Sequence, residues 1–302
     1  KGAVMDLRFI GLGGDRIVSA GTKDANDYMV KIWDSFTAEL LLRIADPNET
    51  SKMCRSVYPS FDDQWPTIVA AFSPLVKVFD TTNGDELLSL DHGHKAVLTC
   101  AAFSPNDALI ATGLFSANKA FLWDASPGQR VLPFAPYRAK RVWALAFSPC
   151  GTKLATVGKT VCLWVSSVYR YQRVHRQLTA SFFSLLPTHV LFFQPTQNAI
   201  DGSMLMRVGK GDTIRGVVLT DQSVTVAAHD GLVRTWDTET EELTSRICHT
   251  VGNVYDCACD VDPTTGAVSR IASGGEDGVL KIWVIDRHSE LVYQNESSAS
   301  GD

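Results

Sequence analysis

Residues 276–283 read EDGVLKIW, and this short stretch contains the pattern from which the fold can be predicted. A tight-turn pair, Asp277-Gly278, is followed by a run in which apolar residues alternate and which ends on the aromatic residue Trp283. Turn residues next to a short alternating run are typical of a β-strand that follows a hairpin turn. The stretch therefore predicts a tight turn and the strand after it.

Runs of the same kind recur along the chain, each ending on an aromatic residue that Asp usually follows. They are Val30–Asp34 (VKIWD), Val76–Asp80 (VKVFD), Ala120–Asp124 (AFLWD), Val161–Val165 (VCLWV), Val233–Asp237 (VRTWD) and Leu280–Val284 (LKIWV). Their aromatic residues lie 46, 44, 41, 72 and 47 positions apart. Four of these spacings agree with the roughly 40–45 residues of a four-stranded propeller blade.

The segments between these runs also repeat. Ala101–Pro105 (AAFSP) and Leu145–Pro149 (LAFSP) each end an alternating apolar run, and each is followed by a polar turn and a second short strand, Leu109–Thr112 or Leu154–Val157. Short strands separated by turn residues at this spacing indicate an all-β protein.

In these repeated strands and turns, the chain resembles the WD-repeat family of β-propellers. Blades of that family contain a buried hydrogen-bonded set of His, Ser or Thr, Asp and Trp. In the last repeat a structural tetrad matches this set in order and spacing, namely His249, Ser273, Asp277 and Trp283. The resemblance implies that these side chains hold the blade together and that His249 is structural, not catalytic.

Other repeats match the tetrad less completely. His94 opens a second repeat with a histidine, which goes on to Thr112 and Trp123, and the resemblance gives this histidine the same structural role. In the repeat that ends at Trp236, Val226 stands where Ser or Thr is expected and no histidine matches. We therefore expect individual blades to differ in their buried hydrogen bonds.

The number of blades is left open by the 72-residue spacing between Trp164 and Trp236. Residues 166–210 are about one blade's worth of chain, so we expect seven blades, one of them degenerate. The alternative is six blades with a long insertion between the third and fourth strands of one of them. The chain would form a single propeller over residues 1–295, from an inner strand Ala3–Phe9 to an outer strand Leu291–Gln294, and the small, polar residues 296–302 predict a flexible tail.

Composition and charge limit the classes of function. The 302 residues carry a formal net charge of -5, which argues against a general nucleic-acid or anionic-membrane surface. No apolar run is long enough to cross a membrane, so no membrane insertion is expected. The seven cysteines, an odd number found mostly in apolar runs, indicate reduced thiols of an intracellular protein, cytoplasmic or nuclear. No catalytic residue, cofactor site or metal site is expected, because no such arrangement of side chains can be identified.

Candidate partner-binding residues follow from the resemblance to a propeller. One end of its central channel is lined by the start of each inner strand and by the tight turn before each third strand. Those positions hold Lys23, Arg141, Trp143, Arg215, His229, Asn253, Tyr255 and Glu276. Exposed aromatic and Arg side chains are the usual anchors of protein interfaces. The alternative for Trp143 and Tyr255 is that they pack between neighbouring blades.

A basic stretch offers a second kind of site. Arg170, Arg173 and Arg176 are interleaved with Tyr169 and Tyr171, a pattern that could contact RNA phosphates and stack on bases. The alternative is a solvated outer strand, which the acidic net charge favours. A nucleic-acid partner is left open but not favoured.

The sequence thus predicts a non-catalytic scaffold that binds other proteins within a larger assembly. An RNA-contacting subunit of a ribonucleoprotein assembly is the first alternative, and a ubiquitin-ligase substrate receptor is the next. Receptors of the cullin-4 ligases often carry Arg at the second place after Trp-Asp, whereas here those places hold Phe36, Thr82, Ser126 and Glu239.

Overall fold

A computed structural model of the chain describes all residues except 1–2, 11–12, 23–29, 45–52, 63–65, 93–96, 116–118, 127, 135–140, 159–160, 166–202, 207–212, 241, 250–251, 263–266, 286–292 and 299–302. The described residues form β-strands joined by turns. Among them, no helix is long and apolar enough to cross a membrane.

The strands form six antiparallel sheets of four strands each. The first sheet contains β1 (Val4–Ile10), β2 (Arg16–Gly21), β3 (Val30–Asp34) and β4 (Leu40–Ile44). The second contains β5 (Cys54–Pro59), β6 (Thr67–Phe72), β7 (Leu75–Asp80) and β8 (Glu86–Asp91). The third contains β9 (Leu98–Phe103), β10 (Leu109–Leu114), β11 (Ala120–Asp124) and β12 (Arg130–Phe134).

The remaining three sheets repeat this order. The fourth contains β13 (Ala144–Phe147), β14 (Lys153–Val157), β15 (Val161–Val165) and β16 (Ser203–Met206). The fifth contains β17 (Ile214–Leu219), β18 (Ser223–Ala228), β19 (Leu232–Asp237) and β20 (Leu243–Cys248). The sixth contains β21 (Val254–Val261), β22 (Val268–Gly275), β23 (Val279–Val284) and β24 (Tyr293–Ser298).

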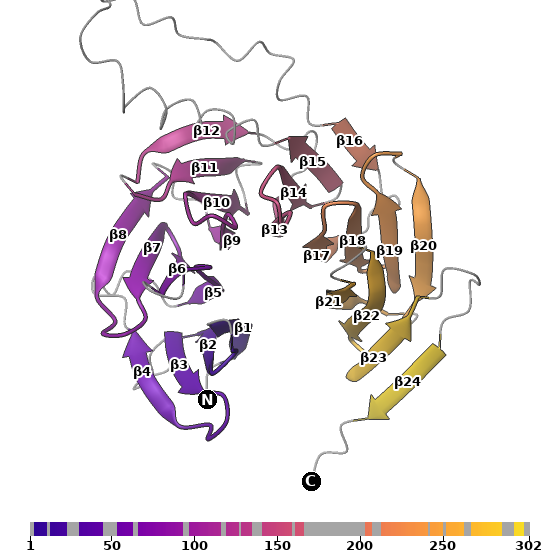
Figure 1. Cartoon of the computed structure of the whole chain (residues 1–302), viewed down its shortest axis with the longest axis horizontal. Helices are drawn as coiled ribbons and strands as arrows, with labels where there is room; N and C mark the ends of the chain where they lie inside the picture. Colours follow the sequence, from indigo (N-terminus) through magenta and orange to yellow (C-terminus); the bar gives the residue numbers. More distant parts are fainter. Residues whose placement is uncertain are drawn as a thin grey trace, which may run out of the picture.

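The sheets are arranged around a common centre like the blades of a propeller (Figure 1). The first strand of each sheet, β1, β5, β9, β13, β17 or β21, lies innermost, and the fourth strand lies at the outer edge. Each inner strand within the arc contacts the inner strands of its neighbours. The predicted all-β fold with four-stranded blades is therefore confirmed.

Blade count is still a prediction, because residues 166–202 lie outside the described residues. Ser203–Met206 lies inside the region predicted as a degenerate blade, and it pairs with Val161–Val165 as the outer strand of the fourth sheet. This pairing is the arrangement expected in the six-blade alternative, in which the intervening residues are an insertion between third and fourth strands.

Both terminal sheets are complete without exchanging strands, as predicted. One predicted boundary is wrong. The outer strand β24 continues to Ser298, so residues 296–298 belong to the sixth sheet and not to a tail. Their backbone pairs with Val279–Lys281, and these ladder bonds hold a small polar segment that composition alone assigns to a tail. The rest of the predicted tail, residues 299–302, lies outside the described residues.

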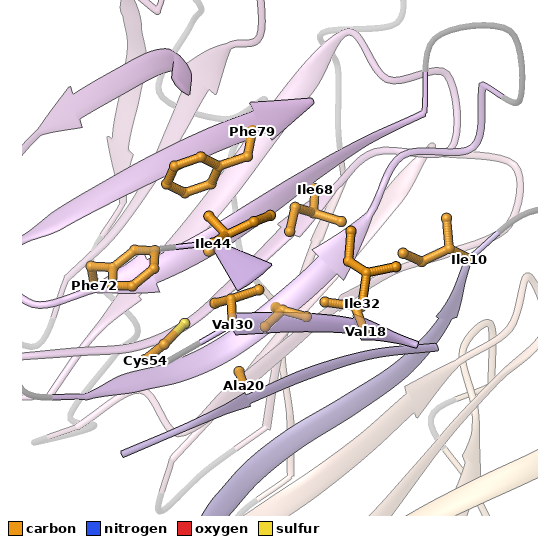
Figure 2. Close-up of a cluster of buried hydrophobic side chains, with 12 residues drawn as sticks. Ile10, Val18, Ala20, Val30, Ile32, Ile44, Cys54, Ile68, Phe72 and Phe79 are labelled. Atoms are coloured by element: carbon orange, nitrogen blue, oxygen red, sulfur yellow. The ribbon is translucent and has the colours of Figure 1, made fainter. Parts of the chain in front are cut away.

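Apolar side chains from facing sheets form the core between them. Between the first two sheets, Val30 and Ile32 of β3 pack with Ile68, Phe72 and Phe79 of the second sheet in one buried cluster (Figure 2). The ring of Phe72 lies edge-on to that of Phe79, with centroids 5.8 Å apart. Burial of each such side chain contributes about 1.5–3 kcal/mol. Packing between sheets therefore fixes their radial arrangement.

The two ends of the arc differ from its interior. In the first sheet, Leu7 and Phe9 are exposed on the face opposite the cluster with the second sheet. In the sixth sheet, Ile282 is 41% exposed, whereas Ile32, at the same distance before the Trp of its strand, is fully buried. The residue in this place is covered where the arc provides a next sheet and exposed where it does not.

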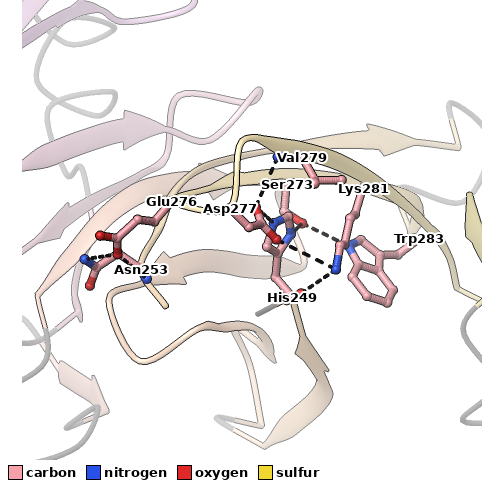
Figure 3. A network of polar contacts seen from close by, with 8 residues as sticks. All are labelled: His249, Asn253, Ser273, Glu276, Asp277, Val279, Lys281 and Trp283. Atoms are coloured by element: carbon pink, nitrogen blue, oxygen red, sulfur yellow. Dashed lines mark hydrogen bonds and ion pairs between the residues drawn. The ribbon is translucent and has the colours of Figure 1, made fainter. Parts of the chain in front are cut away.

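The predicted tetrad is present in the sixth sheet (Figure 3). The Ser273 hydroxyl lies 2.7 Å from His249 Nδ1 and accepts a hydrogen bond of 2.9 Å from Trp283 Nε1. His249 Nε2 lies 3.2 Å from a carboxylate oxygen of Asp277, and that oxygen also accepts from the Val279 N–H. The tetrad therefore joins the turn before β23 to the middle of β22 and to β23.

In the third sheet the histidine assignment needs correction. The side chain that bonds the Thr112 hydroxyl is that of His92, at 2.9 Å, and Trp123 Nε1 donates to the same hydroxyl at 3.0 Å. His94, which the sequence assigned to this role, lies outside the described residues. The two histidines are two positions apart, and spacing alone could not decide which one reaches the hydroxyl.

The hydrogen bond from a Trp indole to a Ser or Thr hydroxyl occurs in more sheets than the sequence indicated. Trp33 Nε1 donates to Ser19 at 2.8 Å and Trp164 Nε1 donates to Thr156 at 2.9 Å, two bonds that were not predicted. In each case the hydroxyl residue pairs with the residue two before the Trp. Val226 occupies this register in the fifth sheet, and the buried Trp236 Nε1 has no hydrogen-bond partner among the described residues.

Replacing Val226 with Thr should therefore stabilise the protein. The new hydroxyl would accept from Trp236 Nε1, and a recovered buried hydrogen bond contributes about 1 kcal/mol, or about 1–3 °C in melting temperature for a chain of this length. Thermal unfolding of V226T against wild type measures the effect.

The matched control is Val233→Thr, which places the same hydroxyl in the apolar cluster between the fifth and sixth sheets. It should lower the melting temperature. A similar loss in V226T would contradict the role assigned to Val226.

Aspartates that end the third strands bind the turns that follow. The Asp34 carboxylate accepts hydrogen bonds from the Thr37 and Phe36 N–H groups, which lower its pKa. The Thr82 hydroxyl and N–H lower the pKa of Asp80, and the Thr240 and Glu239 N–H groups lower that of Asp237. All three aspartates therefore accept hydrogen bonds from the turns that follow their strands.

These depressed pKa values predict a loss of stability in acid. Each carboxylate stabilises the fold above its unfolded-state pKa of about 4, and the contribution disappears as the pH falls through the lower folded-state pKa. Melting temperatures of wild type and of the Asp34→Asn, Asp80→Asn, Asp237→Asn variant should be compared from neutral pH to about pH 2. Wild type should fall more steeply below about pH 4; parallel curves would refute the assignment.

Candidate protein-binding face

The inner strands begin with a shared irregularity. In β17, Ile214 pairs with Ala228 and Gly216 with Ala227, so Arg215 is an extra residue without a partner on β18. Tyr255 in β21, Thr99 in β9 and Met5 in β1 are extra residues at the same place. Such β-bulges redirect a side chain out of the sheet. The bulges therefore collect side chains from several sheets at one end of the inner strands, here called the upper face.

Four side chains of the upper face form a cluster of arginine and aromatic residues. The guanidinium carbon of Arg215 lies 4.0 Å from the ring centroid of Trp143, and that of Arg141 lies 4.2 Å from the centroid of Phe115. The Phe115 and Trp143 rings meet edge to face, 5.1 Å apart. These residues come from the third, fourth and fifth sheets and make up what is called below the Arg–aromatic cluster.

The surroundings of Arg215 are positively charged. Partial burial lowers its pKa, the nearby Tyr255 acts in the opposite direction, and the charge of Arg55 lowers the pKa further. In the part of the chain that the structure describes, Arg55, Arg141 and Arg215 take part in none of the ion pairs. The cluster thus has guanidinium groups that no described carboxylate neutralises.

Two further pairs belong to the upper face. The His229 ring lies edge-on to Tyr255, with centroids 5.7 Å apart, and Tyr255 is 45% exposed. The Glu276 carboxylate accepts a 2.8 Å hydrogen bond from the Asn253 side-chain amide (Figure 3). The Glu276 carboxylate is therefore bonded within the turn of the sixth sheet, and among the described ion pairs it has none with an arginine of the Arg–aromatic cluster.

The structure brings most of the predicted partner-binding residues together. The guanidinium groups of Arg141 and Arg215 both lie over the ring of Trp143. Tyr255 contacts the ring of His229 and acts to raise the pKa of Arg215. Trp143 is half-buried against Phe115 and both arginines. Its side chain therefore packs partly between sheets, as the alternative expected, and is partly exposed. Lys23 and the basic residues Arg170, Arg173 and Arg176 lie outside the described residues.

Sequence reasoning missed Phe115 and Arg55. The Phe115 N–H donates to the carbonyl of Val97, just as the N–H groups of His229 and Glu276 donate to Thr213 and Asn253. Phe115 therefore occupies the turn position already assigned to His229 and Glu276 in their repeats. Residues 116–118 after it hold no Asp-Gly turn signal, which concealed the equivalence. Arg55 lies in the irregular start of β5, where Arg55 and Ser56 lie opposite Ala71.

The described residues hold no group of three or more His, Cys, Asp or Glu side chains placed to bind a metal ion. Cys100 and Cys257 are fully packed into the core, and burial raises the pKa of both thiols. The described side chains of the Arg–aromatic cluster are cationic and aromatic groups.

Comparison with known proteins agrees with this architecture. The family model described as "WD domain, G-beta repeat" matches residues 84–124, 132–164 and 241–284. These three segments match WD40 repeats, which agrees with the four-stranded sheets in which they lie.

Two curated relatives share part of the sequence. The chain is similar to WD repeat and SOCS box-containing protein 1 of Xenopus tropicalis, with 30% identity over 96 residues, and to that of Danio rerio, with 29% identity over 100 residues. The matches cover 32% and 33% of this chain and 22% of each relative. The similarity therefore spans about a fifth of the length of these relatives.

Proposed function

We propose that the chain is a non-catalytic scaffold that binds other proteins within a multi-subunit complex, and that it binds them through the upper face. WD-repeat domains bind other proteins, and the observation that carries the finer proposal is the Arg–aromatic cluster. Trp, Tyr and Arg are the side chains most enriched among the energetic anchors of protein interfaces. Here they gather from separate sheets at the ends of the inner strands.

The cluster is also rigid enough to act as a preformed site. Trp143 and Phe115 have few rotatable bonds, and each is held by a guanidinium over its ring. Their backbone is tied to neighbouring strands, because the Trp143 N–H donates to Val157 and the Val142 N–H donates to Leu114. A preformed surface loses less conformational entropy when a partner binds. We place the protein inside the cell, in agreement with its odd number of cysteines, most of which lie in apolar runs.

A second candidate is a substrate receptor of a ubiquitin ligase. The names of the two relatives combine WD repeats with a SOCS box. The absence of Arg at the second place after the aromatic–Asp pairs argues against the cullin-4 type of receptor but not against others. The RNA-contacting alternative depends on Arg170, Arg173 and Arg176 and remains a prediction from the sequence.

The scaffold proposal can be tested by affinity purification of the full-length protein from its own cells, followed by mass spectrometry. In the variant Trp143→Ala, Arg215→Glu, Tyr255→Ala, partner recovery should drop about tenfold or more, since each anchor is worth about 1–4 kcal/mol. Folding of the variant is checked by thermal unfolding.

The control variant is Phe36→Ala, Arg246→Glu, Leu87→Ala, which makes comparable changes at exposed positions away from the inner strands. It should keep all partners. Partners retained by the upper-face variant, or lost equally from both variants, would reject this face as the binding site. Recovery of ligase subunits among the partners would favour the second candidate.

A further inference from the structure

We propose that the upper face recognises an acidic segment of its protein partner, whose anionic side chains bind the edges of the Arg141 and Arg215 guanidinium groups while apolar residues beside them contact Trp143, Phe115 and Tyr255. The inference rests on the scaffold function proposed above and names the chemistry of the partner.

The two guanidinium groups are each held against an aromatic ring. Arg215 lies over the face of Trp143 and Arg141 over the face of Phe115. An aromatic ring covers one flat face of a guanidinium and forms no hydrogen bond to its edge, where the N–H donors point outward in a fixed fork. That fork matches the two oxygens of a carboxylate or the oxygens of a phosphate. Both arginines are exposed, so their edges are accessible to a partner.

The positive charge of the arginines at the upper face complements the negative charge of an acidic segment. Arg55, Arg141 and Arg215 form no ion pair with any described carboxylate, and Arg55 lies near enough to Arg215 to lower its pKa. Like charges brought this close repel one another, and an anion between them removes the repulsion. Glu276, an acidic residue in the described part of the upper face, binds Asn253 and forms none of the described ion pairs. The missing counter-charge is therefore expected from the ligand.

Two acidic residues, Asp6 and Asp256, lie one position further along their inner strands than the bulged residues. Asp256 follows the bulged Tyr255 and lies against Gly216, and Asp6 follows the bulged Met5. Both carboxylates accept backbone hydrogen bonds, Asp256 from Cys257 and Asp6 from Val57. The Asp6 carboxylate is also paired with Arg8, so Asp256 is the carboxylate that repels an anion entering beyond the level of the arginines.

A protein segment fits this surface better than a nucleic acid. Binding a long phosphate backbone requires many Lys and Arg residues along a track. Here the described arginines of the upper face form one compact cluster and no extended track, on a chain with a formal net charge of -5.

The test starts from a random-peptide library displayed on phage and selected on the full chain. Selection on wild type should enrich peptides that combine Asp or Glu with an aromatic or aliphatic residue. Selection on the Arg141→Gln, Arg215→Gln variant should lose this enrichment. Selection on Arg246→Gln, which removes one charge from the exposed outer strand β20, should keep it.

Fluorescence anisotropy with an enriched peptide then gives affinities. The Arg141→Gln, Arg215→Gln variant should bind about tenfold or more weakly, and high salt should weaken wild type in the same direction. A phosphoserine version of the peptide distinguishes the source of the anion: tighter binding assigns the site to phosphorylated segments, and equal or weaker binding assigns it to carboxylates. Both results support an anionic segment.

Several outcomes would overturn the inference. These are enrichment of neutral or basic peptides, no enrichment at all, the same acidic enrichment on the double glutamine variant, or tighter binding of single-stranded poly-uridine RNA than of the peptide. The scaffold proposal fails independently of these, because its test is the loss of cellular partners. Partners lost from the upper-face variant without acidic selection would leave the scaffold function standing and reject the ligand chemistry.

Discussion

Each sheet of this protein has two largely apolar faces, and neither can be buried within the sheet itself. The rest of the structure depends on this constraint. Stacking the sheets face to face buries Ile32, Ile68 and Phe79 between the first two and repeats the arrangement around the arc. Because the sheets twist and stack radially, their inner strands converge on one centre. A binding face made from single residues of separate sheets is a direct consequence of the way the core is buried.

Within each sheet, a second requirement acts on the buried indole group. A Trp is large enough to fill the space between sheets, but its N–H needs an acceptor in an apolar environment. Four described sheets supply Ser19, Thr112, Thr156 or Ser273 in the same register. The second sheet avoids the requirement by placing Phe79 there, and the fifth leaves Trp236 without an acceptor. The histidine and the aspartate of the tetrad are additions to this simpler bond, which explains why sheets that lack them still form.

The fold could be predicted because its determinants are local and repeated. The aromatic residue that ends each third strand, and the Asp after it, follow from alternation and turn chemistry and need no knowledge of the remaining chain. Predictions failed where a three-dimensional contact decides between neighbouring residues. His92 binds Thr112 in the role that the sequence assigned to His94, and the pairing of residues 296–298 with β23 extends a strand that composition ends earlier.

The candidate site shows the same division. Arg141, Trp143, Arg215 and Tyr255 could be named from their places at the starts of inner strands, whereas Phe115 and Arg55 are evident only once the hydrogen bonds of the turns and the register of β5 are known.

The bulge at the start of the inner strands connects the stability of the protein to its recognition chemistry. An extra residue in a strand leaves its own side chain without a place in either packed face, so its identity is free of the constraint that fixes the core. The residues on both sides of Arg215 show the contrast: Ile214 is fully buried in the cluster between the fourth and fifth sheets, and Gly216 is packed so closely that any side chain would collide with Asp256. Arg215 itself is exposed and lies outside this cluster, with its guanidinium over the ring of Trp143. Packing between sheets therefore does not require Arg215 or Tyr255 at these exposed positions, and their presence there is better explained by what they bind than by what they stabilise.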